Sequence, residues 1–405
     1  MIVGLVLTMS AFATHIETDR SWYLAGEAMK VSVTIDSARY AYAELCDTHS
    51  MAAGVVFSLD GGKGTGTIEL PSDLHSGYYL LSVYTRDNAD VSQRLVAVVN
   101  PLRKSVDDDI EWVKEDNIEE GGMRKEEGDY LGGEKLSKLI DLRETEGHII
   151  KARVRNDYGG HTFKGSLINP SLSIIGKQIH YFEGKMVDDS TAVFFTYGVH
   201  GKLPLVLSAV SSTGVSLPIE MISPFAILLP KQLPHLVFHY NRSEVEARSL
   251  DMQRHQMVMK QGDRSQETGV SRYDDTVFGI KPDLSYNLDE YRQFLTIREV
   301  LLEYVICVRN RKVNGVPQLF VLGDQTLDVN SWPAMVLIDG MPVIDVERLL
   351  NYDARRVHYI NIYSNQFTFG HGVYNGILSF VTRSGQLTNY PVEPNMQYLM
   401  YDFPK

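Results

Sequence analysis

Alternation of apolar and polar residues predicts strands through the first hundred positions. Val31, Val33 and Ile35 alternate with polar neighbours, which is the period of a half-buried strand. The Asp60-Gly61-Gly62 stretch supplies turn chemistry between two such runs. Further strands are predicted at residues 55–59, 66–70, 78–85 and 95–99. Short strands at this spacing predict a β-sandwich domain over residues 14–101.

The pattern resumes after an interruption and predicts a second β-sandwich over residues 147–230. Its strands are expected at residues 149–154, 172–175, 192–196, 205–209 and 219–222. A polar connector follows at 231–286, with mixed charge and no long apolar run. Two interpretations of its central part, 241–283, stay open: a partly helical connector, or a loop that orders only on contact with a partner.

From residue 287 the pattern mixes helical and strand periods, which predicts a small α+β domain over residues 287–390. Leu288, Tyr291 and Leu295 recur at helical spacing, and Leu349 and Leu350 are placed on a second helix. Strands are expected at residues 304–308, 319–322, 335–338, 357–363 and 376–382. Residues 391–405 are assigned to a C-terminal tail. The predicted class is therefore mainly β, with two β-sandwich domains followed by a small α+β domain.

The composition and charge of the chain limit the classes of function that it can have. The 405 residues carry 39 basic and 51 acidic side chains, for a net charge of −12, which disfavours a nucleic-acid partner. Acidic residues concentrate in residues 102–146, which we interpret as a flexible linker. The two cysteines, Cys46 and Cys307, are too few for a disulfide framework.

The beginning of the chain resembles an export signal. An apolar run at residues 2–10 ends in Ala11-Phe12-Ala13, a small-residue cleavage pattern that predicts a signal peptide over 1–13. The alternative is a buried first strand. The run is far shorter than the ~20 residues that a membrane-spanning helix needs, and no later segment qualifies, so no transmembrane segment is predicted.

Sequence signatures of catalysis are not found. The chain contains no H-E-x-x-H, G-x-S-x-G or G-x-x-x-x-G-K-[ST] motif. The glycines of residues 61–66 precede a strand, so a hairpin turn is favoured over a phosphate loop. His235 and His239 share one face of a predicted strand, but a metal site there would need further ligands. We predict no catalytic residue, no cofactor and no metal site.

Two stretches resemble known families. Tyr23-Leu24-Ala25-Gly26-Glu27 leads into a strand, and Ser76-Gly77-Tyr78-Tyr79 into a second, aromatic-rich one. This order resembles the macroglobulin-type sandwich of exported bacterial surface proteins. The reactive Cys-Gly-Glu-Gln motif of the thioester traps does not occur, so the resemblance does not imply that activity.

The second resemblance is to the plug domain of TonB-dependent outer-membrane receptors and covers roughly residues 300–385. It rests on the run from Val336 through Ile338-Asp339-Gly340-Met341-Pro342, then Phe369-Gly370 and Asn375-Gly376, ending at Gly385. Phe369 replaces the usual Tyr, and the Arg-Gly-Ala before Asn-Gly is not matched. Only 20 residues follow Gly385, fewer than a receptor barrel would need. The structural plug-like motif residues are Asp339, Gly340, Pro342, Gly370, Asn375 and Gly376.

The resemblance implies a non-enzymatic, exported envelope protein of the periplasm or outer membrane. It would be an assembly or accessory protein whose plug-like domain docks on an outer-membrane barrel or its complex. The alternative is a surface adhesin, or a module that binds glycan or protein. A hydrolase whose site is assembled only by the fold is a third hypothesis.

The Asp339-Gly340 pair is expected to organise a hairpin without doing chemistry. Asp-Gly suits a two-residue turn because glycine tolerates a positive φ. Asn-Gly suits the same turn, so the sequence predicts that Asp339→Asn costs much less stability than Gly340→Val, for which strain of about 1–3 kcal/mol is expected.

Export should remove residues 1–13, so that the mature protein begins at Thr14. Mass spectrometry of the N-terminal peptide of the native protein tests this cleavage. A cytoplasmic protein that retains Met1 would contradict both the signal peptide and the envelope partner.

Overall fold

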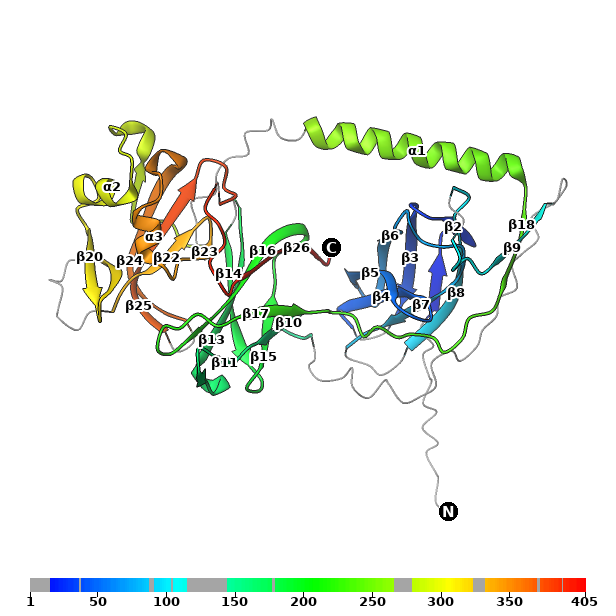
Figure 1. The fold of residues 1–405 in the computed structure, drawn as a ribbon, viewed down its shortest axis with the longest axis horizontal. Helices are drawn as coiled ribbons and strands as arrows, with labels where there is room; N and C mark the ends of the chain where they lie inside the picture. The colour runs from blue at the N-terminus through cyan, green and yellow to red at the C-terminus, as the bar shows by residue number, and fades with distance from the viewer. Residues whose placement is uncertain are drawn as a thin grey trace, which may run out of the picture. The chain divides into compact units, whose positions relative to one another are not determined.

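The structure is a computed structural model that describes residues 15–35, 38–86, 91–102, 105–114, 144–176, 179–265, 279–322, 332–369, 372–387 and 389–405. The predicted signal peptide and most of the predicted acidic linker lie outside these residues. The predicted mainly-β class is confirmed. The chain divides into two compact units, of which the first holds residues 1–145, 225–270 and 402–405. Figure 1 shows the elements of each unit along the chain.

The first unit contains two β-sheets that share one apolar core. Side chains on one face of each strand alternate into that core, as Ala41, Ala43 and Leu45 do from β4. The sheet orders are β1-β3-β6 and β2-β8-β7-β4-β5. The strands are β1 (His15–Thr18), β2 (Trp22–Leu24), β3 (Ala28–Thr34), β4 (Tyr40–Cys46), β5 (Met51–Ser58), β6 (Lys63–Glu69), β7 (Gly77–Tyr84) and β8 (Val91–Val99).

The outer face of the five-stranded sheet is covered by chain that comes much later in the sequence. Strand β18 (Leu236–Tyr240) pairs in parallel with β9 (Ile110–Lys114), and helix α1 (Arg242–Ser265) follows. Leu236 and Phe238 of β18 pack with Leu24 and Val99 in a second apolar cluster. The flexible linker predicted over 102–146 is therefore wrong for β9, because its backbone pairs with β18.

An arginine of helix α1 binds the sandwich, beside the apolar packing of Val245. Arg248 Nη2 lies 2.6 Å from Glu27 Oε2 and donates to the Trp22 carbonyl at 3.1 Å. Its guanidinium also stacks 3.6 Å from the centroid of the Trp22 ring. This mostly buried contact fixes the start of the helix that the sequence left open between a helical connector and a loop.

A buried carboxylate binds residues 226–228, a segment before β18 that we call the strap. Glu44 on β4 is fully buried, and its Oε2 accepts from the Tyr84 hydroxyl at 3.1 Å and from the Ile227 amide at 3.0 Å. Its Oε1 accepts from the Leu228 amide, and the Tyr84 hydroxyl oxygen accepts from the Ala226 amide at 2.8 Å. Glu44 thus anchors residues 226–228 on the outer face of the sheet. Burial raises the pKa of Glu44, although these donors act in the opposite direction.

The second unit holds a seven-stranded sheet of order β17-β10-β15-β14-β13-β16-β26. Residues 397–403, predicted as part of a tail, form its edge strand because apolar side chains such as Tyr401 alternate inward. The strands are β10 (His148–Val154), β13 (Ile168–Ile174), β14 (His180–Met186), β15 (Thr191–Thr196), β16 (Gly201–Ser211), β17 (Ile219–Ile222) and β26 (Gln397–Phe403). A short hairpin, β11 (Asp157–Tyr158) and β12 (His161–Thr162), and the 3₁₀ turn η2 (Gly165–Leu167) project from it.

The same unit contains a mixed five-stranded sheet of order β19-β24-β25-β22-β23. Strands β22 and β25 run parallel, and the other pairs are antiparallel. The strands are β19 (Leu284–Asn287), β22 (Met335–Ile338), β23 (Met341–Pro342), β24 (Val357–Phe369) and β25 (Gly372–Thr382). We refer to the described residues of 284–387 as the plug-like domain, a name taken only from the resemblance noted in the sequence.

Two helices and one hairpin complete the plug-like domain. Helix α2 (Ile297–Glu303) begins with a capping box between Thr296 and Glu299, and α3 (Val346–Leu350) confirms the helix predicted around Leu349. The 3₁₀ turns η4 (Leu288–Glu290) and η5 (Ala354–Arg356) precede α2 and β24. The strand predicted at 304–308 is wrong: a turn follows α2, and β20 (Val308–Val313) then pairs with β21 (Val316–Val321).

The plug-like domain shares apolar clusters with the seven-stranded sheet. Ile175 and Val206 pack in the cluster that contains Val336 and Phe380. A second cluster joins Ile179 to residues of β22, β24 and β25. Among the described residues, no helix is both long and apolar enough to cross a membrane.

Replacing Glu44 with Gln should release the strap. The Gln amide group would face a backbone N–H, leaving at least one buried donor unpaired at a cost of ~1–3 kcal/mol. Hydrogen exchange followed by mass spectrometry should show faster exchange at residues 225–230 in Glu44→Gln, and no change in the exposed control Glu69→Gln.

The raised pKa of Glu44 predicts how the stability of the first unit changes with pH. Because the folded pKa of Glu44 is raised, the folded state binds more protons than the unfolded state in the window between the two pKa values. The free energy of unfolding of the first unit should therefore fall as pH rises through that window, and this slope should shrink in Glu44→Gln. If the dependence of the free energy of unfolding on pH were the same in Glu44→Gln, the raised pKa of Glu44 would be contradicted.

Candidate functional site

The first half of the predicted motif forms the turn between β22 and β23. Asp339 has φ 47° and Gly340 has φ 94°, so both turn residues lie in the left-handed region, as the two-residue turn requires. The Asp339 side chain is fully buried. Its carboxylate accepts from the Thr382 amide at 2.7 Å, the Thr382 hydroxyl at 2.5 Å and the Leu387 amide at 2.7 Å. Asp339 thus ties the hairpin to the turn that follows β25.

These contacts bear on the expectation that Asn at position 339 would cost much less stability than Val at position 340. That expectation considered the turn alone, and the structure adds three donors that converge on the carboxylate. An Asn side chain would point its NH₂ group at one of the donors. Burial raises the pKa of Asp339 against the effect of these same hydrogen bonds.

Gly340 is required by space as well as by its φ. A Cβ atom there would lie 2.9 Å from Ile179 Cγ2 and 3.2 Å from the Ile174 carbonyl oxygen. Pro342 follows on β23, where it pairs with Leu337. The turn therefore contacts the end of β13 in the neighbouring sheet.

The second half of the motif lies elsewhere on the same sheet. Gly376 on β25 has φ 94°, and a Cβ there would lie 2.7 Å from the Tyr363 carbonyl oxygen. Asn375 accepts from Gln366 Nε2 at 3.2 Å, beside a register shift between β24 and β25. Gly370 lies outside the described residues.

The two halves of the motif do not meet. The β22–β25 ladder pairs Met335 with Ile377 at one end and Ile338 with Phe380 at the other. Asn375 and Gly376 precede the first pair, and Asp339 follows the second. The motif residues therefore shape the two ends of the sheet, and the structure brings no reactive group of theirs together.

A third buried carboxylate has the same kind of partners. Glu393 accepts from the Ile344 amide at 3.0 Å and from the Asp345 amide at 3.1 Å, just before α3. The Tyr390 hydroxyl donates to it at 3.3 Å, and burial raises its pKa. Like Glu44 and Asp339, this carboxylate is used to fix backbone.

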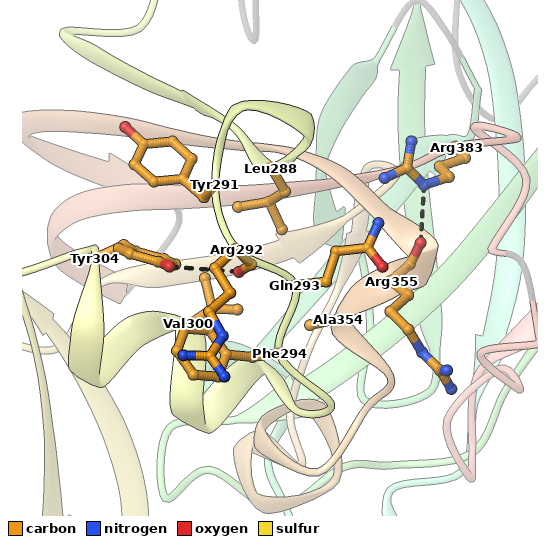
Figure 2. Close-up of a pocket in the computed structure, with 10 residues that line it drawn as sticks. All are labelled: Leu288, Tyr291, Arg292, Gln293, Phe294, Val300, Tyr304, Ala354, Arg355 and Arg383. Atoms are coloured by element: carbon orange, nitrogen blue, oxygen red, sulfur yellow. Dashed lines mark hydrogen bonds between the residues drawn. The ribbon is translucent and has the colours of Figure 1, made fainter.

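The pocket shown in Figure 2 is small. It lies between η4, α2 and η5, and its volume of about 10 Å³ holds about one water molecule. The Tyr304 hydroxyl donates to the Arg292 carbonyl at 3.4 Å, and Arg383 Nε donates to the Arg355 carbonyl at 2.8 Å. Arg383 also binds Asp289 at 2.6 Å. These contacts join the loop before α2 to the sheet.

The histidines considered for a metal site do not share a centre. His235 Nδ1 contacts Asp109 Oδ1, and His239 is exposed on β18. Within the described ranges, no three metal-ligating side chains gather.

Several of the exposed apolar side chains lie between residues 295 and 316 of the plug-like domain. Leu302 on α2 is 76% exposed and Ile306 in the following turn is 67% exposed. Leu295, Val313 and Val316 are also exposed, at the start of α2 and at the tip of the β20–β21 hairpin. We call these five residues the 295–316 surface; its elements are yellow in Figure 1. The sequence pattern did not indicate this surface: it placed Leu295 on a predicted helix and Ile306 in a predicted strand, and it singled out none of the other three.

The comparisons with known proteins leave the family open. The sequence matches no protein-family model and no curated protein. Among solved structures, a biofilm-associated protein BSP domain is 10% identical at a TM-score of 0.18, over 54% of this chain and 30% of that chain. The native Escherichia coli alpha-2-macroglobulin is 14% identical at a TM-score of 0.19, over 52% of this chain and 14% of that one. Likenesses at this level carry no argument about fold or function.

Replacing Asp339 with Asn should destabilise the second unit by ~1–3 kcal/mol, because one buried backbone donor loses its acceptor. The control is Asp157→Asn, at an exposed residue of the β11–β12 hairpin in the same unit, which should change stability little. Denaturant unfolding, followed by hydrogen exchange and mass spectrometry of the peptides that contain residues 335–343 and 377–382, measures both. Equal stability of the two variants would show that Asp339 acts through its turn alone.

Proposed function

We propose that this chain is an exported, non-enzymatic binding protein of a Gram-negative cell envelope. In this proposal the plug-like domain docks on a protein partner, either an outer-membrane barrel or a component of its complex. The order of the Asp339-Gly340 and Asn375-Gly376 turns, which resembles that of receptor plugs, supports this assignment. The apolar run before Ala13 supports export.

The observation that carries the proposal is the 295–316 surface. Singly scattered exposed apolar residues are ordinary, whereas contiguous ones mark protein-interaction sites, and we propose that the five side chains of this surface act together. The folding of the domain leaves these side chains in water while it buries Val300 and Leu301 of the same helix. A partner that covers Leu302 and Ile306 would remove apolar area from water, at a gain of ~25 cal/mol per Å².

The buried carboxylates support a binding role over a catalytic one. A general acid or base needs a lone pair or proton directed at a substrate. Glu44, Asp339 and Glu393 instead direct their oxygens at backbone amides of their own chain. Their raised pKa values follow from burial within structural contacts.

One observation favours a second candidate, a surface adhesin that binds glycan. Trp112 on β9 is 38% exposed, and its ring lies 5.3 Å from that of Tyr240 on β18. Exposed aromatic rings offer apolar faces with polar edges. This pair belongs to the first unit, so variants distinguish the two candidates.

Purification of the tagged full-length protein from detergent-solubilised outer membranes should recover a defined partner, identified by mass spectrometry. The double variant Leu302→Glu/Ile306→Glu should lose that partner, because charges would be buried in the interface. Leu250→Glu, at an exposed position of α1, should retain it. Equal recovery by both variants would contradict docking through the 295–316 surface, and glycan binding abolished by Trp112→Ala would favour the adhesin.

A further inference from the structure

The outer edge of β20 is an open position for another strand. Strand β20 pairs with β21 on one side, and no other described strand pairs with it. It is six residues long, whereas the edge strands β19 and β23 of the five-stranded sheet have four and two. An open edge presents unpaired N–H and C=O groups that can accept a strand from another chain.

The register identifies the outward backbone groups. The Leu322 amide donates to the Cys307 carbonyl at 2.7 Å, so this pair is hydrogen-bonded. Bonded pairs alternate in an antiparallel ladder, which makes Arg309–Phe320 and Arg311–Gln318 bonded pairs as well. The N–H and C=O groups of Asn310 and Lys312 therefore point away from β21.

The side chains of this edge have one sign of charge. Arg309, Arg311 and Lys312 are all exposed, and none forms an ion pair with a described residue. No Asp or Glu occurs between residues 304 and 323. Arg309 and Arg311 share one face because they are two residues apart, and the Arg311 guanidinium lies 5.8 Å from the centroid of the Phe320 ring on that face.

The positive charge of β20 determines which kind of strand can pair with its open edge. Charged side chains commonly protect edge strands from pairing. Here the protection acts against a second copy of this chain, because two β20 strands side by side would place like charges opposite each other. It does not act against an acidic strand, whose carboxylates would lie opposite the arginines.

We propose that β20 binds an extended acidic segment of a partner protein by strand addition. This inference deepens the proposed function and rests on it. The partner segment pairs with Asn310 and Lys312 through its backbone. It places acidic side chains two residues apart, opposite Arg309 and Arg311. The exposed Ile306 and Val313 flank the paired stretch and contact apolar residues at its ends.

A selection tests the proposal without a known partner. A phage-displayed library of random ten-residue peptides is panned on the full-length protein. Enriched peptides should be acidic at alternate positions, with β-branched residues between them. Their binding should fall by at least about tenfold in Arg309→Glu/Arg311→Glu, since attraction becomes repulsion at two cross-strand pairs. The matched control Lys185→Glu/Lys202→Glu reverses two exposed charges on the neighbouring sheet and should leave binding unchanged.

A second variant tests the backbone contribution. Asn310→Pro removes one outward N–H and leaves the bonded pairs to β21 in place, because proline is tolerated on the open side of an edge strand. Circular dichroism and a thermal melt check that the domain remains folded. Binding of the enriched peptides should be lost in Asn310→Pro. Failure to enrich acidic peptides, or binding that survives both variants, would overturn the proposal, as would dimerisation of the protein that Asn310→Pro abolishes.

The two proposals fail separately. If a membrane partner is recovered equally by wild type and Asn310→Pro, the docking function stands and strand addition at β20 is overturned. If acidic peptides bind β20 but no partner is recovered from membranes, strand addition stands and the envelope docking function is overturned.

Discussion

A carboxylate that is removed from water needs hydrogen-bond donors in the folded chain. Three buried carboxylates of this protein accept hydrogen bonds from backbone amides of distant segments. Glu44 receives amides of residues 227 and 228, Asp339 those of 382 and 387, and Glu393 those of 344 and 345. Each arrangement couples two parts of the chain that no local pattern links. Breaking one leaves buried donors unpaired, a cost far above that of an ordinary surface contact. These anchors decide which segments lie on which sheet.

The sequence predicted what local periodicity controls. Strands such as β3 and β7, and the left-handed turn at Asp339-Gly340, follow from alternation and from turn chemistry. It misplaced β20, because Val308–Val313 contains four consecutive polar residues and shows no alternation. It also missed the covering of the first sandwich by β18, since pairing between residues 110 and 236 depends on the folded chain.

Only the backbone conformation of the candidate site could be predicted from the sequence. Gly340 and Gly376 were recognisable as turn residues, and their positive φ values agree with that assignment. A side chain does not fit at either position because of tertiary contacts: Ile179 lies against Gly340, and Val321 lies against Gly376. Likewise, the Asp339 carboxylate has partners 43 and 48 residues away, which a motif of neighbouring letters does not contain.

Charge is distributed unevenly over this acidic protein, and that bears on how β20 meets a partner. The net charge of −12 would repel an acidic segment at long range. At physiological ionic strength, charges more than ~8 Å apart are largely screened, so the approaching segment responds mainly to Arg309, Arg311 and Lys312. Lowering the salt concentration strengthens both the local attraction and the long-range repulsion. Association at this edge is therefore governed by contact geometry and register more than by electrostatic steering, which makes the backbone of Asn310 as important as the charges around it.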